Sequence, residues 1–315
     1  MTILVTGGAG FIGSNLIDQL TLEGHKVICL DNFDTFYERS IKEANIFEFS
    51  KSDSVEVLEG DIRDRELLGR IFGGNKIDLV IHLAAKAGVR PSISHPHDYY
   101  DVNTIGTLAI LEAMKKHSVS KMIFASSSSV YGNHTPIPFS EDAIVDAPIS
   151  PYAATKRSAE LMCHVYCMLH KFDISCLRFF TVYGPRQRPD LAIHKFTKLI
   201  YEGKAIPFFG DGDTARDYTY IDDVVAGIIN AAKFLKGYNV YNIGESKITS
   251  LNELLEILSN EMNKKVIVDR LPFQEGDVQV TCADVSKSKR EINYNPSIDM
   301  PEGIRRFLIW FYAQY

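Results

Sequence analysis

Two residues near the middle of the chain, Tyr152 and Lys156, have types and a spacing that suit proton transfer. They follow Pro151, which favours the first turn of a helix because its missing N–H has no partner there. Residues four apart lie on one helix face, so the ammonium can stabilise a phenolate and lower the phenol pKa from its ordinary value of about 10. Ser127, within a run of serines, could relay a proton or hold a substrate oxygen. Together these side chains predict acid–base catalysis at a secondary alcohol, although the Tyr–Lys spacing alone is more typical of an ordinary surface pair.

A glycine-rich segment, residues 6–13, follows the first predicted strand and opens the first predicted helix. Glycine permits a tight turn and a close approach of the backbone to a pyrophosphate, and the helix N-terminus supplies free N–H groups. Asp31 ends the next strand, where a carboxylate accepts hydrogen bonds from a ribose and repels a 2′-phosphate. The segment therefore predicts bound NAD rather than NADP. Asp61, at the end of the third strand, is either an adenine contact or a helix N-cap.

Short apolar runs rich in Val, Ile and Leu alternate with amphipathic runs through the first half of the chain. We predict strands at residues 3–6, 27–30, 55–58, 79–83, 122–125 and 174–179, and helices at 11–22, 102–116 and 151–170. Buried strands that alternate with helices indicate an α/β protein with a doubly wound parallel sheet, the Rossmann arrangement. The glycine segment, Asp31 and the serine run all follow strands, so we expect them at the carboxyl edge of this sheet.

The second half of the chain is less regular. It contains a turn-rich stretch at 185–189, predicted helices at 191–202, 221–236 and 251–263, and a short predicted strand at 266–268. We predict an NAD-binding Rossmann domain over residues 1–180, with returning elements near 215–245. Residues 181–315 are predicted to form mainly a smaller, mixed α/β substrate domain.

Composition narrows the function classes. The 315 residues are 45% hydrophobic and 23% charged, which is typical of a globular protein with a full core. The net charge of −6 and the absence of a basic run argue against nucleic-acid binding. No apolar run reaches the roughly 20 residues of a membrane span, and no secretory leader is evident, so we expect a cytoplasmic protein. Five irregularly spaced cysteines argue against a disulfide framework and, with too few clustered ligands, against a metal site.

The chain resembles the NAD-dependent epimerase/dehydratase family, the extended short-chain dehydrogenase/reductases that act on nucleotide sugars. The motifs that carry the resemblance are residues 6–13, 82–85, 126–132, Tyr152 with Lys156, 179–185, 209–212, 216–223, 242–244, 276–278 and 283–284. They cover nearly the whole chain. The resemblance implies tightly held NAD, a UDP-sugar substrate, and a homodimer formed through the helices near 102–117 and 152–170.

The resemblance also assigns site residues. The expected catalytic residues are Ser127, Tyr152 and Lys156. The expected NAD contacts are Gly7, Gly10, Phe11, Ile12, Gly13, Asp31, Asn32, Asp61, Ile62, Leu83, Ala84, Ala85, Lys86, Tyr152 and Lys156. The expected substrate contacts are Ser127, Ser128, Ser129, Thr181, Arg188, Arg216 and Asp277. Gln274 departs from the family pattern, since many members have an arginine there that helps to hold the UDP.

The serine run favours one reaction within the family. Related 4,6-dehydratases carry Thr-Asp-Glu at positions 127–129, and their acidic pair eliminates water; related UDP-glucuronate decarboxylases carry a glutamate at the third position. Here all three residues are serines. The pattern therefore favours epimerisation at C4, in which Tyr152 acts first as base and then as acid while a 4-keto sugar forms and NAD is reduced and reoxidised.

The choice of sugar rests on Arg186 and Arg188, in a stretch that resembles UDP-glucuronate 4-epimerases. Arginine binds carboxylates bidentately, and galactose epimerases usually have Asn in place of Thr181 and lack the arginine pair. We predict that Ser128, Ser129, Thr181 and Arg188 surround the uronate carboxylate, and that Arg216 meets the pyrophosphate. The sequence leaves three alternatives open: a solvated or internally paired role for the arginines, a UDP-glucose or UDP-N-acetylglucosamine 4-epimerase, and a noncatalytic NAD-sensing protein.

Overall fold

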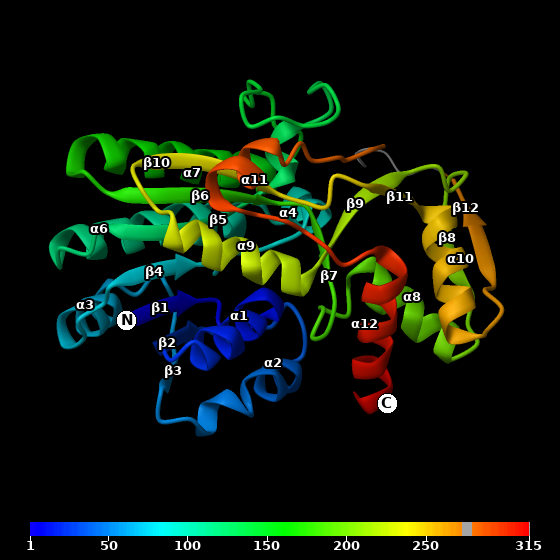
Figure 1. Ribbon diagram of the computed structural model, residues 1–315, viewed down its shortest axis with the longest axis horizontal. Coiled ribbons are helices and arrows are strands. Elements are labelled where there is room, and N and C mark those ends of the chain that lie inside the picture. The colour runs from blue at the N-terminus through cyan, green and yellow to red at the C-terminus, as the bar shows by residue number, and fades with distance from the viewer. Residues whose placement is uncertain (273–278, 315) are drawn as a thin grey trace.

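A seven-stranded parallel sheet forms the centre of the computed structural model, which describes residues 1–272 and 279–314 (Figure 1). The strand order is β10-β6-β5-β4-β1-β2-β3. The strands are β1 (Thr2–Thr6), β2 (Lys26–Asp31), β3 (Val55–Glu59), β4 (Leu79–His82), β5 (Lys121–Ser127), β6 (Asp173–Phe179) and β10 (Tyr238–Ile243). The six predicted strands and the doubly wound fold class are confirmed; β10, at the sheet edge, was not predicted as a strand.

Helices cover both faces of this sheet, as Figure 1 shows. One face carries α1 (Phe11–Leu22) and α9 (Ile221–Lys233), and the other carries α3 (Arg65–Gly74), α6 (Thr107–Lys116) and α7 (Pro151–His170). Alternate residues of β1 enter two separate cores: Ile3 and Val5 pack with α1 and α9, whereas Leu4 packs with the opposite helices. This two-sided burial explains the continuous apolar character of the strands.

The helix predicted at 102–116 begins earlier and is composite. It consists of α5 (Pro96–Tyr99), a π-helical stretch η2 (Tyr100–Gly106) and α6. Pro96 occupies the first helical turn, a position that proline favours, and it marks the true start. The predicted helix at 151–170 is confirmed as α7, which Ser150 caps by accepting a hydrogen bond from the N–H of Ala153 at 3.1 Å.

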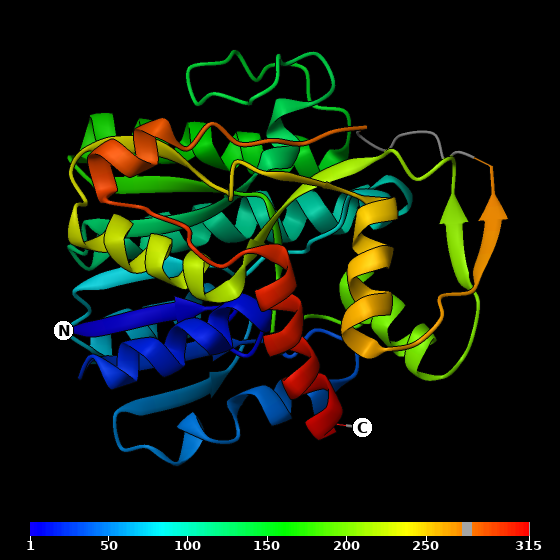
Figure 2. The same ribbon diagram turned by 45° about the vertical axis from the view of Figure 1, so that its right-hand side comes forward.

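The second half of the chain divides between the large sheet and a smaller region at one end of the molecule (Figure 2). Helix α9 and strand β10 return to the large sheet. The smaller region contains β7 (Thr181–Tyr183), β8 (Ile206–Phe209), β9 (Ala215–Tyr220), β11 (Ile248–Ser250), β12 (Val268–Leu271), α8 (Ala192–Tyr201), α10 (Leu251–Met262) and α12 (Met300–Gln314). The strand predicted at 266–268 was wrong in its bounds, since β12 starts at Val268 and pairs with β8. The domain division at residue 180 stays a prediction.

The remaining elements are short or lie outside the predicted periodicities. They are α2 (Arg39–Ile46), η1 (Phe49–Lys51), α4 (Val89–Ser94), η3 (Ser128–Tyr131) and α11 (Ser286–Ile292). Within the described ranges, no helix combines the length and apolarity that a membrane crossing requires.

Candidate active site

A cavity of about 500 Å³ opens at the carboxyl edge of the large sheet, between the loops that follow β1, β2, β4 and β5. Strands β1 and β4 are neighbours at the point where the strand order reverses, which is where ligands bind in open α/β sheets. A second cavity of about 300 Å³ lies in the smaller region, and Thr181 and Leu191 line both cavities.

The glycine segment forms the floor of the larger cavity. Gly7 has a φ of +72°, and a side chain there would bring its Cβ within 2.8 Å of the Ala84 nitrogen. A Cβ on Gly13 would lie 2.3 Å from the Gly7 oxygen. Both positions are thus packed against the protein's own backbone, and helix α1 begins at Phe11, so Gly10 and the first residues of the helix line the cavity. The segment thus fits a dinucleotide pyrophosphate, which needs close backbone approach and free N–H groups.

Asp31 lines the cavity at the end of β2, but its carboxylate already has several donors from its own chain. It accepts from the N–H of Ala9 at 3.1 Å and of Phe33 at 2.8 Å, and from the Lys42 ammonium at 3.0 Å. Lys42, on α2, is itself buried. Its partnership with Asp31 was not foreseen. A ribose contact at Asp31 stays a prediction.

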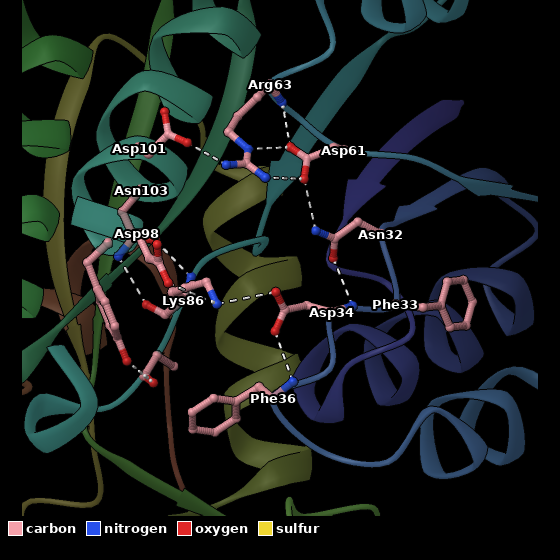
Figure 3. Close-up of polar contacts among 12 residues, drawn as sticks. Asn32, Phe33, Asp34, Phe36, Asp61, Arg63, Lys86, Asp98, Asp101 and Asn103 are labelled. Atoms are coloured by element: carbon pink, nitrogen blue, oxygen red, sulfur yellow. Dashed lines mark hydrogen bonds and ion pairs between the residues drawn. The ribbon is translucent and has the colours of Figure 1, made fainter. Parts of the chain in front are cut away.

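Asp61 belongs to a polar network along the cavity rim, which Figure 3 displays. It accepts two hydrogen bonds from the Arg63 guanidinium, both at 2.9 Å, and one from the Asn32 amide at 3.0 Å. The Arg63 hydrogen bonds lower the pKa of Asp61 to about 2. The N-cap of α3 is Asp64, which excludes that alternative role for Asp61.

Lys86 connects the loop after β4 to the loop after β2 (Figure 3). Its ammonium lies 3.3 Å from an Asp34 carboxylate oxygen and 4.0 Å from Asp98. Its backbone N–H donates to the Asn103 side-chain oxygen at 2.8 Å. Because β1 lies between β4 and β2, this ion pair spans the rim above the glycine segment.

Tyr152 and Lys156 lie together in the cavity wall, on the first turns of α7. Burial raises the pKa of Tyr152, whereas a hydrogen bond with Ser127 and the positive charge of Arg188 lower it. The buried Lys156 ammonium donates to the Ala125 carbonyl at 2.7 Å, and its pKa falls to about 8 because of burial. Ser127 and Arg188, rather than Lys156, are therefore the groups that favour the phenolate in the free protein; a pKa effect of Lys156 stays a prediction.

A buried ion cluster beneath these residues was missed from the sequence. The Glu160 carboxylate is fully buried and accepts from Arg178 Nε and Nη2, both at 2.9 Å, from Arg157 at 3.0 Å and from the Ser126 hydroxyl at 2.6 Å. Glu160 lies one helical turn after Lys156. The cluster ties α7 to β5 and β6, and so sets the catalytic helix against the serine run.

Three serines at the end of β5 and just beyond it line the same cavity as the glycine segment. The Ser127 hydroxyl donates to the Ser129 hydroxyl at 3.1 Å, and the Ser129 N–H donates back to Ser127 at 3.2 Å. Ser128 begins the short helix η3, and Thr181 of β7 faces the same space. The region around Tyr152 therefore presents hydroxyl groups where an eliminating enzyme needs carboxylic acids.

The two arginines of the 186–190 loop are paired with carboxylates. Arg188 donates to Asp190 from Nε at 2.9 Å and from Nη2 at 2.8 Å, while Arg186 lies 2.6 Å from Asp18. Internal ion pairing thus holds for both in this structure. Arg188 also lines the cavity that contains Tyr152, whereas Arg186 does not.

Arg216 lies outside the cavity that contains the catalytic pair. Arg216 lines the second cavity and donates to the Ala215 and Gln279 carbonyls at 3.0 and 3.1 Å. Asp277 and Gln274 lie outside the described residues.

The sequence profile of the NAD dependent epimerase/dehydratase family matches residues 3–244, more than half of the chain. The chain belongs to this family. Among its relatives, the UDP-glucuronate 4-epimerase of Thermodesulfobacterium geofontis is 46% identical, over 98% of this chain and 95% of that protein. UDP-glucuronate 4-epimerase 3 of Arabidopsis thaliana is 40% identical, over 100% of this chain and 77% of that protein.

Solved structures of the epimerase/dehydratase family share the fold described above. The UDP-glucuronic acid 4-epimerase of Bacillus cereus, in complex with UDP-glucuronic acid and NAD, superposes with a TM-score of 0.94 at 36% identity, over 100% of both chains. A UDP-glucose 4-epimerase of Thermotoga maritima, with UDP-glucose, gives 0.92 at 34% identity, over 100% of this chain and 99% of that one.

Proposed function

We propose that this protein is an NAD-dependent UDP-glucuronate 4-epimerase, which interconverts UDP-glucuronate and UDP-galacturonate through a 4-keto sugar. One observation carries the assignment: a single cavity brings together Tyr152, three serines and the Arg188 guanidinium. The arginine suits a carboxylate on the sugar, and the serines offer no acid for elimination. The names of the relatives at 40–46% identity agree with this reading.

NAD fits the larger cavity because Gly7, Gly10 and Gly13 line it at the N-terminus of α1, where backbone N–H groups can meet a pyrophosphate. The glycine segment would hold the pyrophosphate, Asp31 the adenosine ribose, Asp61 the adenine, and Lys156 the nicotinamide ribose. When bound, NAD supplies a reversible hydride acceptor next to C4 of the sugar.

The chain's own residues handle the proton and the orientation of the sugar. Tyr152 accepts the proton of the C4 hydroxyl. Ser127, whose hydrogen bond with the phenol lowers the pKa of Tyr152, would also contact the C4 oxygen. Tyr152 then returns the proton after the planar 4-keto sugar has turned over. Arg216, in the second cavity, would hold the pyrophosphate of UDP during this rotation.

A firm grip on the uronate carboxylate has a chemical purpose. Once C4 is a ketone, the sugar is a β-keto acid that loses CO₂ when the carboxylate bond aligns with the ketone π system. Ser128, Ser129, Thr181 and Arg188 would hold the carboxylate out of that alignment. The protein therefore epimerises rather than decarboxylates.

A substrate panel tests the proposal. We expect purified protein to convert UDP-glucuronate to UDP-galacturonate, to leave UDP-glucose and UDP-N-acetylglucosamine largely unchanged, and to form little UDP-pentose. Tyr152→Phe is expected to lower kcat by about 10²–10⁴-fold without loss of the fold, since it removes the acid–base group. Conversion of the neutral sugars alone would make the protein a UDP-glucose-type epimerase, and full activity of Tyr152→Phe would exclude the mechanism.

We also propose that the protein is a cytoplasmic homodimer. Large apolar side chains are exposed along η2 and α7, among them Tyr100 at 46%, Ile105 at 45%, Leu161 at 51% and Met168 at 61%. A patch of this kind on two adjoining helices is typical of a protein interface. Light scattering of the wild type is expected to give twice the mass of one chain. The double variant Leu161→Glu with Met168→Glu is expected to be monomeric. A monomeric wild type would contradict the proposed dimer.

A further inference from the structure

We propose that Asp190 and Phe36 are positioning residues that fix the Arg188 guanidinium with one edge free for the substrate carboxylate. The inference rests on the proposed function, since it concerns how the uronate is recognised. Neither residue is expected to touch the reacting atoms. Their role is to hold Arg188 in a single orientation before the sugar arrives.

The contact with Asp190 occupies one defined edge of the guanidinium. Asp190 accepts from Nε and Nη2, which form the side-on fork of the group. Nη1 makes no hydrogen bond to another described residue. Arginine has five N–H donors in a rigid plane, so a carboxylate on the side-on fork leaves the Nη1 end available for a second acceptor.

The contact with Phe36 places an aromatic ring next to the same group. The guanidinium carbon of Arg188 lies 5.1 Å from the centre of the Phe36 ring, within the range of a cation–π contact. The two contacts differ in kind, because Asp190 accepts hydrogen bonds from two guanidinium nitrogens and Phe36 offers an aromatic ring to the positive charge. An arginine side chain otherwise has many rotamers, and binding would have to order it.

Phe36 is itself held in place by the network of Figure 3. The Phe36 N–H donates to one carboxylate oxygen of Asp34 at 2.9 Å, and the Lys86 ammonium lies 3.3 Å from the other. Asp34 in turn donates its N–H to the Asn32 side chain at 3.0 Å. The orientation of Arg188 is therefore linked to the ends of β2 and β4, which also form the cofactor cavity.

The location of the pair supports a role in sugar recognition. Arg188 lines the larger cavity together with Tyr152, whereas Asp190 lines the second one together with Arg216. The Arg188–Asp190 pair thus lies at the boundary between the space for the reacting sugar and the space proposed for UDP. A uronate at Tyr152 would meet the free edge, while a neutral sugar would leave that edge without a partner, which costs binding energy.

Binding measurements on the NAD-loaded protein test the proposal with Asp190→Asn, Phe36→Leu and a control. The control is Asp18→Asn, which breaks the Arg186 pair on the same loop at comparable exposure. We expect Asp190→Asn to weaken UDP-glucuronate about tenfold, equivalent to about 1.4 kcal/mol, and Phe36→Leu about threefold. The affinity for UDP alone, which lacks the carboxylate, should change less than twofold in every variant. Asp18→Asn should bind UDP-glucuronate as tightly as the wild type.

Turnover gives a second, independent readout. Asp190→Asn should raise KM for UDP-glucuronate more than it lowers kcat, and should increase the fraction of UDP-pentose.

Two results would overturn the proposal. Tighter UDP-glucuronate binding by Asp190→Asn would show that Asp190 competes with the substrate. An equal loss of affinity for UDP would show a general structural role. If the wild type converts UDP-glucuronate but the variants behave like Asp18→Asn, the positioning role is rejected and the proposed function is kept. If the wild type does not convert UDP-glucuronate, the proposed function itself is rejected.

Discussion

The Glu160→Gln variant tests how far the buried ion cluster determines the stability of the catalytic helix. The Glu160 side chain is 0% exposed, and that of Arg178 is 2% exposed. One carboxylate oxygen accepts from Arg178 Nε and Ser126, and the other accepts from Arg178 Nη2 and Arg157. In either orientation, a glutamine amide would place its NH₂ group against an Arg178 N–H. A buried guanidinium would then lack its counter-charge.

The size of the effect follows from this burial. Removal of one partner of a buried ion pair costs about 3–5 kcal/mol. An unfolding entropy of about 2.1 cal/mol/K per residue gives about 0.66 kcal/mol/K over 315 residues, so the melting temperature should fall by about 5–8 °C. Glu302 is the matched control, because it also accepts from two arginines but is 38% exposed. Glu302→Gln should destabilise the protein much less than Glu160→Gln, because solvent screens an exposed ion pair.

Thermal and urea unfolding at one fixed protein concentration would measure both variants. Arg178→Met combined with Glu160→Gln should be less destabilised than the sum of the two single changes, since the double variant leaves no unpaired buried charge. Because Ser126 precedes Ser127 and Glu160 follows Lys156 by one turn, kcat should also fall. A loss of stability in Glu160→Gln no larger than that in Glu302→Gln would refute the reasoning.

Two further predictions concern the cofactor loop and the catalytic lysine. Gly13→Ala should weaken NAD binding at least tenfold in a fluorescence titration, because the new Cβ would lie 2.3 Å from the Gly7 oxygen. Gly69→Ala is the control, because a Cβ at that position would meet open space. Equal NAD affinity in the two variants would contradict the prediction. The pKa of Lys156 is about 8 in the folded protein, against 10.5 ordinarily. Between these pH values the Lys156 amine is protonated in the unfolded chain but not in the folded one. The contribution of Lys156 to the free energy of unfolding should therefore rise with pH across that window. Melting curves of Lys156→Met should lack this rise; parallel curves for wild type and variant would count against a depressed pKa.

The sequence predicted the structure correctly where an element is defined by its own periodicity or by residues adjacent in the chain. Buried strands such as β1 and β5 read as continuous apolar runs, because helices cover both faces of the sheet. The glycines at 10 and 13 are required by contacts with Gly7 and Gly8, only a few residues away, so their spacing could be recognised from the sequence alone. The capped start of α7 follows from Ser150 and Pro151, adjacent residues with strong positional preferences.

The missed features depend on contacts between distant segments. Nothing in the local pattern around Lys42 indicates that it reaches Asp31, and Glu160 meets Arg178 only because α7 packs on β6. The short strands β7 and β11 pair with β9, so their partners rather than their own periodicity define them. One signal was available: Asp190, two residues after Arg188, is close enough in sequence for an ion pair to be anticipated.

Lys156 differs from the other cations that line the cavity in its lack of a carboxylate partner among the described residues. Lys42, Lys86 and Arg188 each lie within 3.3 Å of a carboxylate, that of Asp31, Asp34 and Asp190 respectively. Lys156 forms no ion pair with a described residue and donates to a backbone carbonyl instead. The nearby Glu160 is already engaged by two arginines, so it offsets the Lys156 charge only weakly. Asp190 offsets part of the Arg188 charge, which still lowers the pKa of Tyr152, whereas no described carboxylate pairs directly with the Lys156 ammonium. Lys156 is therefore a positive charge of the cavity wall without a carboxylate partner among the described residues, and its burial lowers its pKa to about 8.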